Sequence, residues 1–170
     1  MKHLILGGVR SGKSRYALSL VNLMAAPETT PIFIATAEAF DTEFAERILR
    51  HQQERSANWN LIETPLELAC VINLLSSQDV AIIDCLTLWL NNVLYHAPNL
   101  LPQYKNQLIE ALSRSEASIV IVSNEVGYSI TPDNPLAREF ADQQGWLNQA
   151  IAAICDKVTL SVAGLPLDIK

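Results

Sequence analysis

The chain has 170 residues, of which 49% are hydrophobic and 18% charged, and its formal net charge at pH 7 is -6. This length predicts a single domain, spanning residues 1–170, with a substantial core. The composition excludes a disordered chain. The negative charge argues against a general nucleic-acid binder, since such proteins are usually basic.

Three cysteines, Cys70, Cys85 and Cys155, are far apart in the sequence, and none has CxxC spacing. This pattern predicts buried thiols in a reducing compartment, and it favours neither a zinc site nor a disulfide framework. We expect no signal peptide, because a glycine-containing loop motif at residues 7–14 lies where the apolar part of a leader would be. The apolar stretches are also too short to predict a membrane span. We therefore expect a cytoplasmic protein without a membrane span.

Strands and helices alternate from the N-terminus onward. Residues 2–6 are a short apolar run that ends at glycine, which predicts a strand. Residues 13–25 have apolar side chains at helical spacing, with no internal Gly or Pro, and predict a helix. Residues 31–36 predict a second buried strand, and residues 42–57 predict a polar helix that Asp41 would cap.

The alternation continues to the end of the chain. Later segments predict a strand at 60–63, helices at 65–75, 86–95, 103–115 and 134–156, and strands at 79–84, 118–123 and 157–162, with a loop at 97–102. Ile- and Val-rich strands that alternate with helices are typical of an α/β protein. The sequence therefore predicts a mostly parallel sheet with helices on both faces.

The junction of the first strand and the first helix matches the pattern G-x-x-x-x-G-K-S. It consists of Gly7, Gly8, Val9, Arg10, Ser11, Gly12, Lys13 and Ser14. In such a P-loop the backbone N–H groups surround phosphates, the lysine reaches the β- and γ-phosphates, and the hydroxyl binds Mg²⁺. The helix N-terminus adds its positive end. The motif in this context predicts a P-loop NTPase-type fold that binds the triphosphate of ATP or GTP.

An acid ends the apolar strand at residues 79–84. In P-loop proteins a carboxylate in the position of Asp84 holds Mg²⁺ through water. The alternative for Asp84 is a helix cap or an ordinary surface acid. Asp79 begins the same strand and would lie at its opposite end.

The predicted helix at residues 42–57 carries Arg47, His51 and Arg55 at four-residue intervals, so these side chains share one face. A histidine between two arginines is disfavoured as a cation, which predicts a neutral, nucleophilic imidazole. The alternative is a solvated face in which the basic side chains pair with nearby glutamates. The residues alone favour this alternative.

Polar side chains also follow other predicted strands. Glu63, Asn124 and Glu125 come at or just after strand ends, where parallel α/β sheets form their ligand crevice. Each is a candidate for contacting ribose, base or substrate, and each is equally explained by turn formation or capping.

Six segments together resemble one family in order and spacing. They are Gly-Gly-Val-Arg-Ser-Gly-Lys-Ser-Arg (7–15), Ile-Ala-Thr-Ala (34–37), Arg-Ile-Leu-Arg-His (47–51), Asp-Cys-Leu-Thr-Leu-Trp-Leu-Asn-Asn (84–92), Ser-Asn-Glu-Val-Gly (123–127) and Val-Ala-Gly-Leu-Pro-Leu (162–167). The family is the bifunctional adenosylcobinamide kinase / adenosylcobinamide-phosphate guanylyltransferase of cobalamin biosynthesis. The resemblance spans the chain.

The resemblance implies two reactions. A nucleoside triphosphate phosphorylates adenosylcobinamide, and GTP then transfers GMP to adenosylcobinamide phosphate through a GMP–histidine intermediate. By position, that histidine is His51, with Lys13 as the second catalytic residue. The resemblance also implies Mg²⁺, held by Ser14 and Asp84, and a homotrimer. It places these further residues at the nucleotide: Ala35, Thr36, Ala37, Gln52, Gln53, Glu54, Glu63 and Asp84.

Two other functions stay open at the level of sequence. One is a P-loop small-molecule kinase without guanylyl transfer. The other is a nucleotide-dependent switch, which the absence of an NKxD guanine-specificity motif disfavours.

Overall fold

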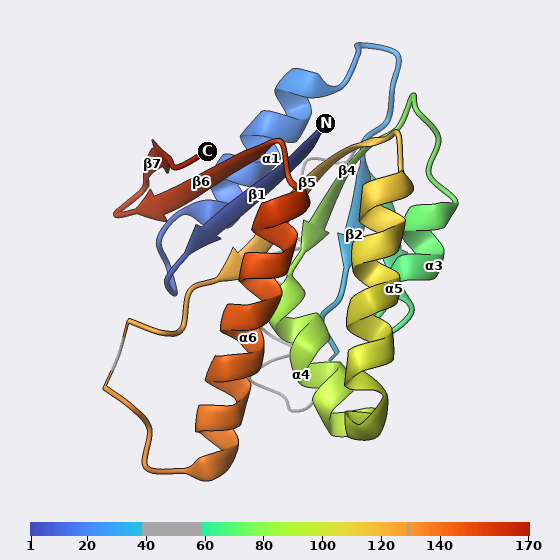
Figure 1. Cartoon of the computed structure of the whole chain (residues 1–170). Coiled ribbons are helices and arrows are strands. Elements are labelled where there is room, and N and C mark those ends of the chain that lie inside the picture. Colours follow the sequence, from blue (N-terminus) through green and yellow to red (C-terminus); the bar gives the residue numbers. More distant parts are fainter. Residues whose placement is uncertain (39–58, 129) are drawn as a thin grey trace.

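A computed structural model describes residues 1–38, 59–128 and 130–170. Its strands, in chain order, are β1 (Lys2–Gly7), β2 (Ile32–Ala35), β3 (Asn60–Glu63), β4 (Val80–Asp84), β5 (Ser118–Asn124), β6 (Lys157–Val162) and β7 (Leu165–Asp168). They form one sheet in the order β3-β2-β4-β5-β1-β6-β7 (Figure 1). Every neighbouring pair is parallel except β6 and β7. The predicted mostly parallel α/β sheet is confirmed.

The helices are α1 (Lys13–Met24), α3 (Leu68–Asn73), α4 (Leu86–His96), η1 (Pro98–Leu100), α5 (Leu101–Arg114) and α6 (Pro135–Ile154). The predicted helix at 65–75 begins later, at Leu68. The predicted loop at 97–102 is wrong in part, because it contains η1 and the first two residues of α5. Pro102 fits this helix start because proline has no N–H, and the first N–H groups of a helix have no partner within the helix. The predicted helix at 42–57 lies outside the described residues.

Helices cover both faces of the sheet. Among the described elements, α1 packs on one face, and α3, α4, α5 and α6 pack on the other (Figure 1). The central strands have nearly continuous burial, with Ile82, Ile83 and Val120 fully buried. Such runs are typical of parallel strands that are covered on both faces. The sheet thereby holds its carboxyl edge as a rigid platform for the loops that follow each strand.

The C-terminal hairpin of β6 and β7 was not expected from the sequence. Ala163 and Gly164, both with positive φ (52° and 82°), make the turn between the two strands. The hairpin is fixed to the sheet through buried His3, whose Nε2 lies 2.7 Å from Thr159 Oγ1, and Thr159 Oγ1 donates to Asp168 Oδ1 at 2.7 Å. The single hydroxyl proton goes to Asp168, so His3 Nε2 donates to Thr159. Burial lowers the pKa of His3, Lys157 lowers it further, and Asp168 opposes the shift.

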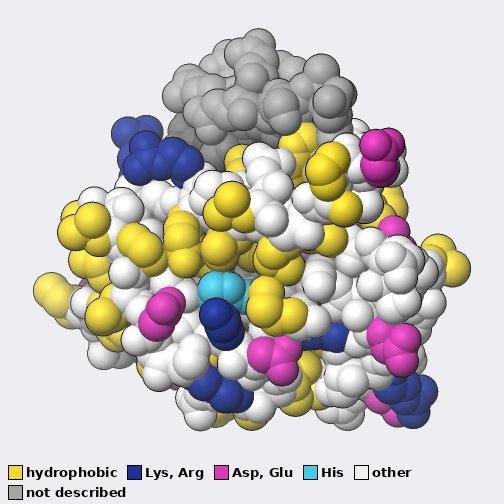
Figure 2. All heavy atoms as spheres, turned by 90° about the horizontal axis from the view of Figure 1, so that it is seen from above, with side chains coloured by type: hydrophobic (Ala, Val, Ile, Leu, Met, Phe, Trp, Pro, Cys, Tyr) yellow, Lys and Arg dark blue, Asp and Glu magenta, His cyan; other side chains and the backbone are white. Residues whose placement is uncertain are grey.

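The surface carries charges of both signs. On the face in Figure 2, basic and acidic side chains are interspersed among hydrophobic ones. Cys85 and Cys155 are buried, as expected, whereas the expectation was wrong for Cys70, which is exposed on α3; all three are free thiols. None of the helices in the described parts of the chain has the length and hydrophobicity that a membrane span requires.

Candidate active site

The loop between β1 and α1 closes tightly against β6. A Cβ atom on Gly7 would lie 2.4 Å from Ser11 Oγ and 2.7 Å from the backbone oxygen of Ser161, so only glycine allows this approach. Gly12 has φ 93° and directly precedes α1, and a left-handed residue is least strained as glycine. The glycines of the motif therefore serve close packing at Gly7 and backbone conformation at Gly12.

The loop of residues 7–14 is exposed to solvent at its centre, and its surroundings favour the binding of an anion. Gly8, Val9 and Arg10 are exposed. The first turn of α1 has no side-chain cap and no acidic residue. Its N–H groups thus remain available, and together with the positive end of the helix dipole they favour phosphate binding.

Lys13 folds back across the loop. Its Nζ donates to the backbone oxygen of Gly8 at 2.9 Å. Burial lowers the pKa of Lys13, and electrostatic interactions with Cys85 and Asp84 oppose this shift. A partly desolvated ammonium gains from a nearby anion, so this position of Lys13 favours the binding of a phosphate group.

Asp84 lies near this lysine, at the carboxyl end of β4. Strand β5 separates β4 from β1, so two strand spacings, about 10 Å, lie between the backbones of Asp84 and the loop. Ser14 is half-buried in the first turn of α1. A hydroxyl and a carboxylate fit Mg²⁺, which binds through one or two carboxylates plus substrate phosphates. The described residues contain no cluster of three or more His, Cys, Asp or Glu side chains that could hold a metal by themselves.

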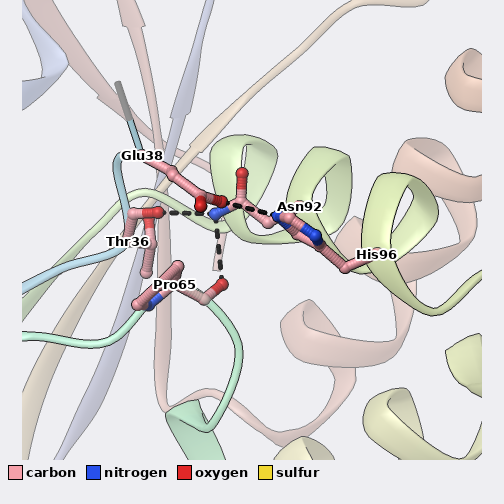
Figure 3. Close-up of polar contacts among 5 residues, drawn as sticks. All are labelled: Thr36, Glu38, Pro65, Asn92 and His96. Carbon is pink, nitrogen blue, oxygen red and sulfur yellow. Dashed lines mark hydrogen bonds and ion pairs between the residues drawn. The ribbon is translucent and has the colours of Figure 1, made fainter. Parts of the chain in front are cut away.

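The end of β2 is built into the same edge. Thr36 is fully buried, and its Oγ1 donates to the backbone oxygen of Cys85 at 2.7 Å and accepts from the Cys85 N–H at 2.9 Å. Buried Asn92 of α4 donates through Nδ2 to the backbone oxygens of Thr36 (2.7 Å) and Pro65 (3.1 Å), as Figure 3 shows. These bonds fix the backbone where Ala35 and Ala37 flank Thr36.

A hydrogen bond holds Glu38, the next residue of the same segment. His96 Nε2, at the end of α4, lies 2.8 Å from Glu38 Oε2, and both side chains are partly exposed (Figure 3). Beyond Glu38 come residues 39–58, which lie outside the described residues and contain His51, Gln52, Gln53 and Glu54.

Glu63 stands apart from the loop. It is exposed at the carboxyl end of β3, the edge strand, where it pairs in register with Ala35. Four strand spacings, about 19 Å, separate β3 from β1. The structure therefore places Lys13 within electrostatic reach of Asp84, with Ser14 following Lys13 in α1, and it places Glu63 at the far end of the same edge.

Two residues whose role the sequence had left open lie between the loop and Asp84. Asn124 ends β5 beside Gly7, and the Glu125 N–H donates to the backbone oxygen of Gly7 at 3.1 Å. The backbone of Asn124 is held by Thr87 Oγ1 (2.9 Å) and by Asn148 Nδ2 (3.0 Å). Their position after a strand was the signal, but only the strand order, with β5 between β1 and β4, reveals how central they are.

Comparison with known proteins agrees with this geometry. Residues 3–169 match the family described as cobinamide kinase / cobinamide phosphate guanyltransferase. The chain belongs to this family. It is 42% identical to the bifunctional adenosylcobalamin biosynthesis protein CobP of Pseudomonas aeruginosa, with 100% of this chain and 98% of the relative covered. It is 36% identical to the bifunctional adenosylcobalamin biosynthesis protein CobU of Salmonella typhimurium, with both chains fully covered.

The fold of this chain also has a likeness among solved structures. A KaiC-like protein from Pyrococcus horikoshii aligns with 94% of this chain and 69% of its own, with a TM-score of 0.51 at 10% identity, a likeness that concerns the fold alone. Family membership confirms the resemblance drawn from the sequence, and with it an enzyme with kinase and guanylyltransferase activities.

Proposed function

We propose that this chain phosphorylates adenosylcobinamide with a nucleoside triphosphate and then transfers GMP from GTP to adenosylcobinamide phosphate. The observation that carries the proposal is the loop of residues 7–14, with Lys13 and Asp84 at its mouth, in a chain that matches the family over residues 3–169. The loop accounts for triphosphate binding. Family membership accounts for the two acceptor substrates, adenosylcobinamide and adenosylcobinamide phosphate.

In the kinase step, the main role of the chain is to bind the nucleoside triphosphate and to orient its phosphates. The N–H groups of the loop and the first turn of α1 hold the phosphates, and Lys13 neutralises charge on the β- and γ-oxygens. The substrate hydroxyl attacks the γ-phosphorus, the bond from that phosphorus to the bridging oxygen breaks, and the nucleoside diphosphate leaves. Mg²⁺, held by Ser14 and Asp84, would supply further charge neutralisation at the phosphates.

In the guanylyl transfer step, we propose that His51 acts as the nucleophile. Its imidazole nitrogen attacks the α-phosphorus of GTP, pyrophosphate leaves, and a phosphoramidate bond joins GMP to the protein. The phosphate of adenosylcobinamide phosphate then attacks the same phosphorus, the P–N bond breaks, and adenosylcobinamide-GDP is released. We assign Ala35, Thr36, Ala37, Gln52, Gln53, Glu54 and Glu63 to the nucleotide.

Three further properties are proposed, the location from the sequence pattern and the metal and subunit number from the family resemblance. We propose a cytoplasmic enzyme, Mg²⁺ as its metal, and a homotrimer. Several large hydrophobic side chains, including Tyr128, Ile130 and Leu136, are strongly exposed in the isolated chain, which supports association with another surface. Sedimentation of the purified protein would measure the number of subunits.

The decisive experiment is transfer of label from GTP labelled at the α-phosphate. We expect the wild-type chain to acquire acid-labile, base-stable label, and His51→Ala to acquire none. His96→Ala is the matched control, because His96 is a partly exposed histidine whose described partner is Glu38. Absence of label in the wild type would leave a monofunctional kinase, and label that survives in His51→Ala would remove His51 as the nucleophile.

A further inference from the structure

The C-terminal hairpin makes specific hydrogen bonds to the phosphate-binding loop. The backbone oxygen of Ser11 accepts from Ser161 Oγ at 2.8 Å and from the Gly164 N–H at 2.8 Å. Ser161 is 2% exposed, so water does not compete freely for this bond. The Ser11 carbonyl, in the middle of the loop, is thus held by two donors, Ser161 and Gly164, which lie some 150 residues later in the sequence.

These bonds determine which way the next N–H group points. The peptide unit is planar and trans, so its C=O and N–H point in opposite directions. Because the Ser11 carbonyl is directed at the hairpin, the N–H of Gly12 is directed away from the hairpin. If the Ser11–Gly12 peptide rotated, a carbonyl oxygen would face the bound phosphates and repel them.

The hairpin turn is fixed in place at close range. A Cβ on Gly12 would lie 3.0 Å from the Cα of Gly164, which leaves no room for a side chain between loop and turn. Gly164 has φ 82°, a conformation in which any other residue is strained. At the other end of β7, the bond from Thr159 Oγ1 to Asp168 fixes the register of the hairpin.

We propose that Ser161 and Gly164 are positioning residues for triphosphate binding. They hold the Ser11 carbonyl outward, so that the N–H groups of the loop converge on the phosphates before the nucleotide arrives. This role rests on the proposed function, since it requires that residues 7–14 bind a triphosphate. It extends that function to a second element, the hairpin of β6 and β7.

The test compares Ser161→Ala with Ser113→Ala in the full-length protein. Ser113 Oγ donates to the backbone oxygen of Ile109 at 2.7 Å on α5, so this control loses the same kind of bond far along the chain from the loop. We expect Ser161→Ala to bind GTP and inorganic tripolyphosphate about three- to tenfold more weakly, the effect of one hydrogen bond, and Ser113→Ala to bind both as the wild type does. Binding is measured by calorimetry.

Tripolyphosphate makes the result specific, because it reports on the phosphate contacts alone. The thermal unfolding temperature without ligand should fall by only about 2–4 °C in Ser161→Ala, the effect of one buried hydrogen bond, so the protein remains folded at the temperature of the binding measurement. Gly164→Ala tests the second donor to the Ser11 carbonyl, the backbone N–H of residue 164. Alanine is strained at φ 82°, so this variant should also weaken tripolyphosphate binding. Unchanged affinity in both hairpin variants would overturn the positioning role, whereas a wild-type chain that bound neither ligand would overturn the proposed function itself.

Discussion

Replacing Gly7 by alanine should reveal how tightly the phosphate-binding loop is packed. The added Cβ would lie 2.4 Å from Ser11 Oγ, which can rotate away, and 2.7 Å from the backbone oxygen of Ser161, which cannot. Strand β6 must then shift, and overpacking of this kind costs about 1–3 kcal/mol. For a chain of this length each kcal/mol lowers the unfolding temperature by about 2–4 °C. A cost near the middle of that range predicts a decrease of about 4–8 °C.

The assay is thermal unfolding followed by circular dichroism, with Gly145→Ala as the matched control. Gly145 lies inside α6, and a Cβ there would meet nothing within 4 Å. Alanine in a helix interior is favoured over glycine by about 0.8–1 kcal/mol, so this control should raise the unfolding temperature by about 2–4 °C. A Gly7→Ala protein as stable as the wild type, with unchanged nucleotide affinity, would refute the close packing of the loop against β6.

Three further predictions concern charges. Lys13→Ala should slow both half-reactions about 10- to 100-fold if they share one triphosphate site, and an unaffected labelling step would require two sites. Asp84→Asn should lower the rate about 10- to 100-fold and raise the Mg²⁺ concentration required, whereas Asp79→Asn, before the start of β4, should change neither. His3 has a lowered pKa when folded, so the unfolded chain binds the proton more readily. The free energy of unfolding should therefore fall as pH decreases below about 6.5, and urea titrations of His3→Gln should lack this component.

The alternation of strands and helices could be predicted because both faces of a parallel sheet are buried. The Ile- and Val-rich run that ends at Asp84 is an example, since four of its five strand residues are buried. Strand β7 could not be predicted, because it is not buried on either face. It is short, exposed throughout and contains Pro166. It is stabilised by pairing with β6 and by the contact of Thr159 with Asp168, neither of which leaves a periodic signal.

The placement of the candidate site residues was predictable where the motif is local and unpredictable where it depends on strand order. Lys13 and Ser14 follow from contiguous residues, and Asp84 follows from its place at the end of a strand. The central position of Glu125 does not, because it requires β5 to lie between β1 and β4. The same holds for Ser161, whose contact with Ser11 joins segments some 150 residues apart.

Chain connectivity bears on whether one triphosphate site can serve both reactions. Glu38 follows β2, and β2 lies three strand spacings, about 14 Å, from β1 and its loop. His51 is 13 residues further along the chain than Glu38, and an extended chain spans about 3.3–3.6 Å per residue. With residues 42–51 helical, as the sequence predicts, the helical rise of about 1.5 Å per residue limits the reach to roughly 27 Å, which is still about twice the separation. A second loop is therefore not needed to bring His51 to a nucleotide held at Lys13, and loss of both activities in Lys13→Ala is the outcome that a single shared site requires.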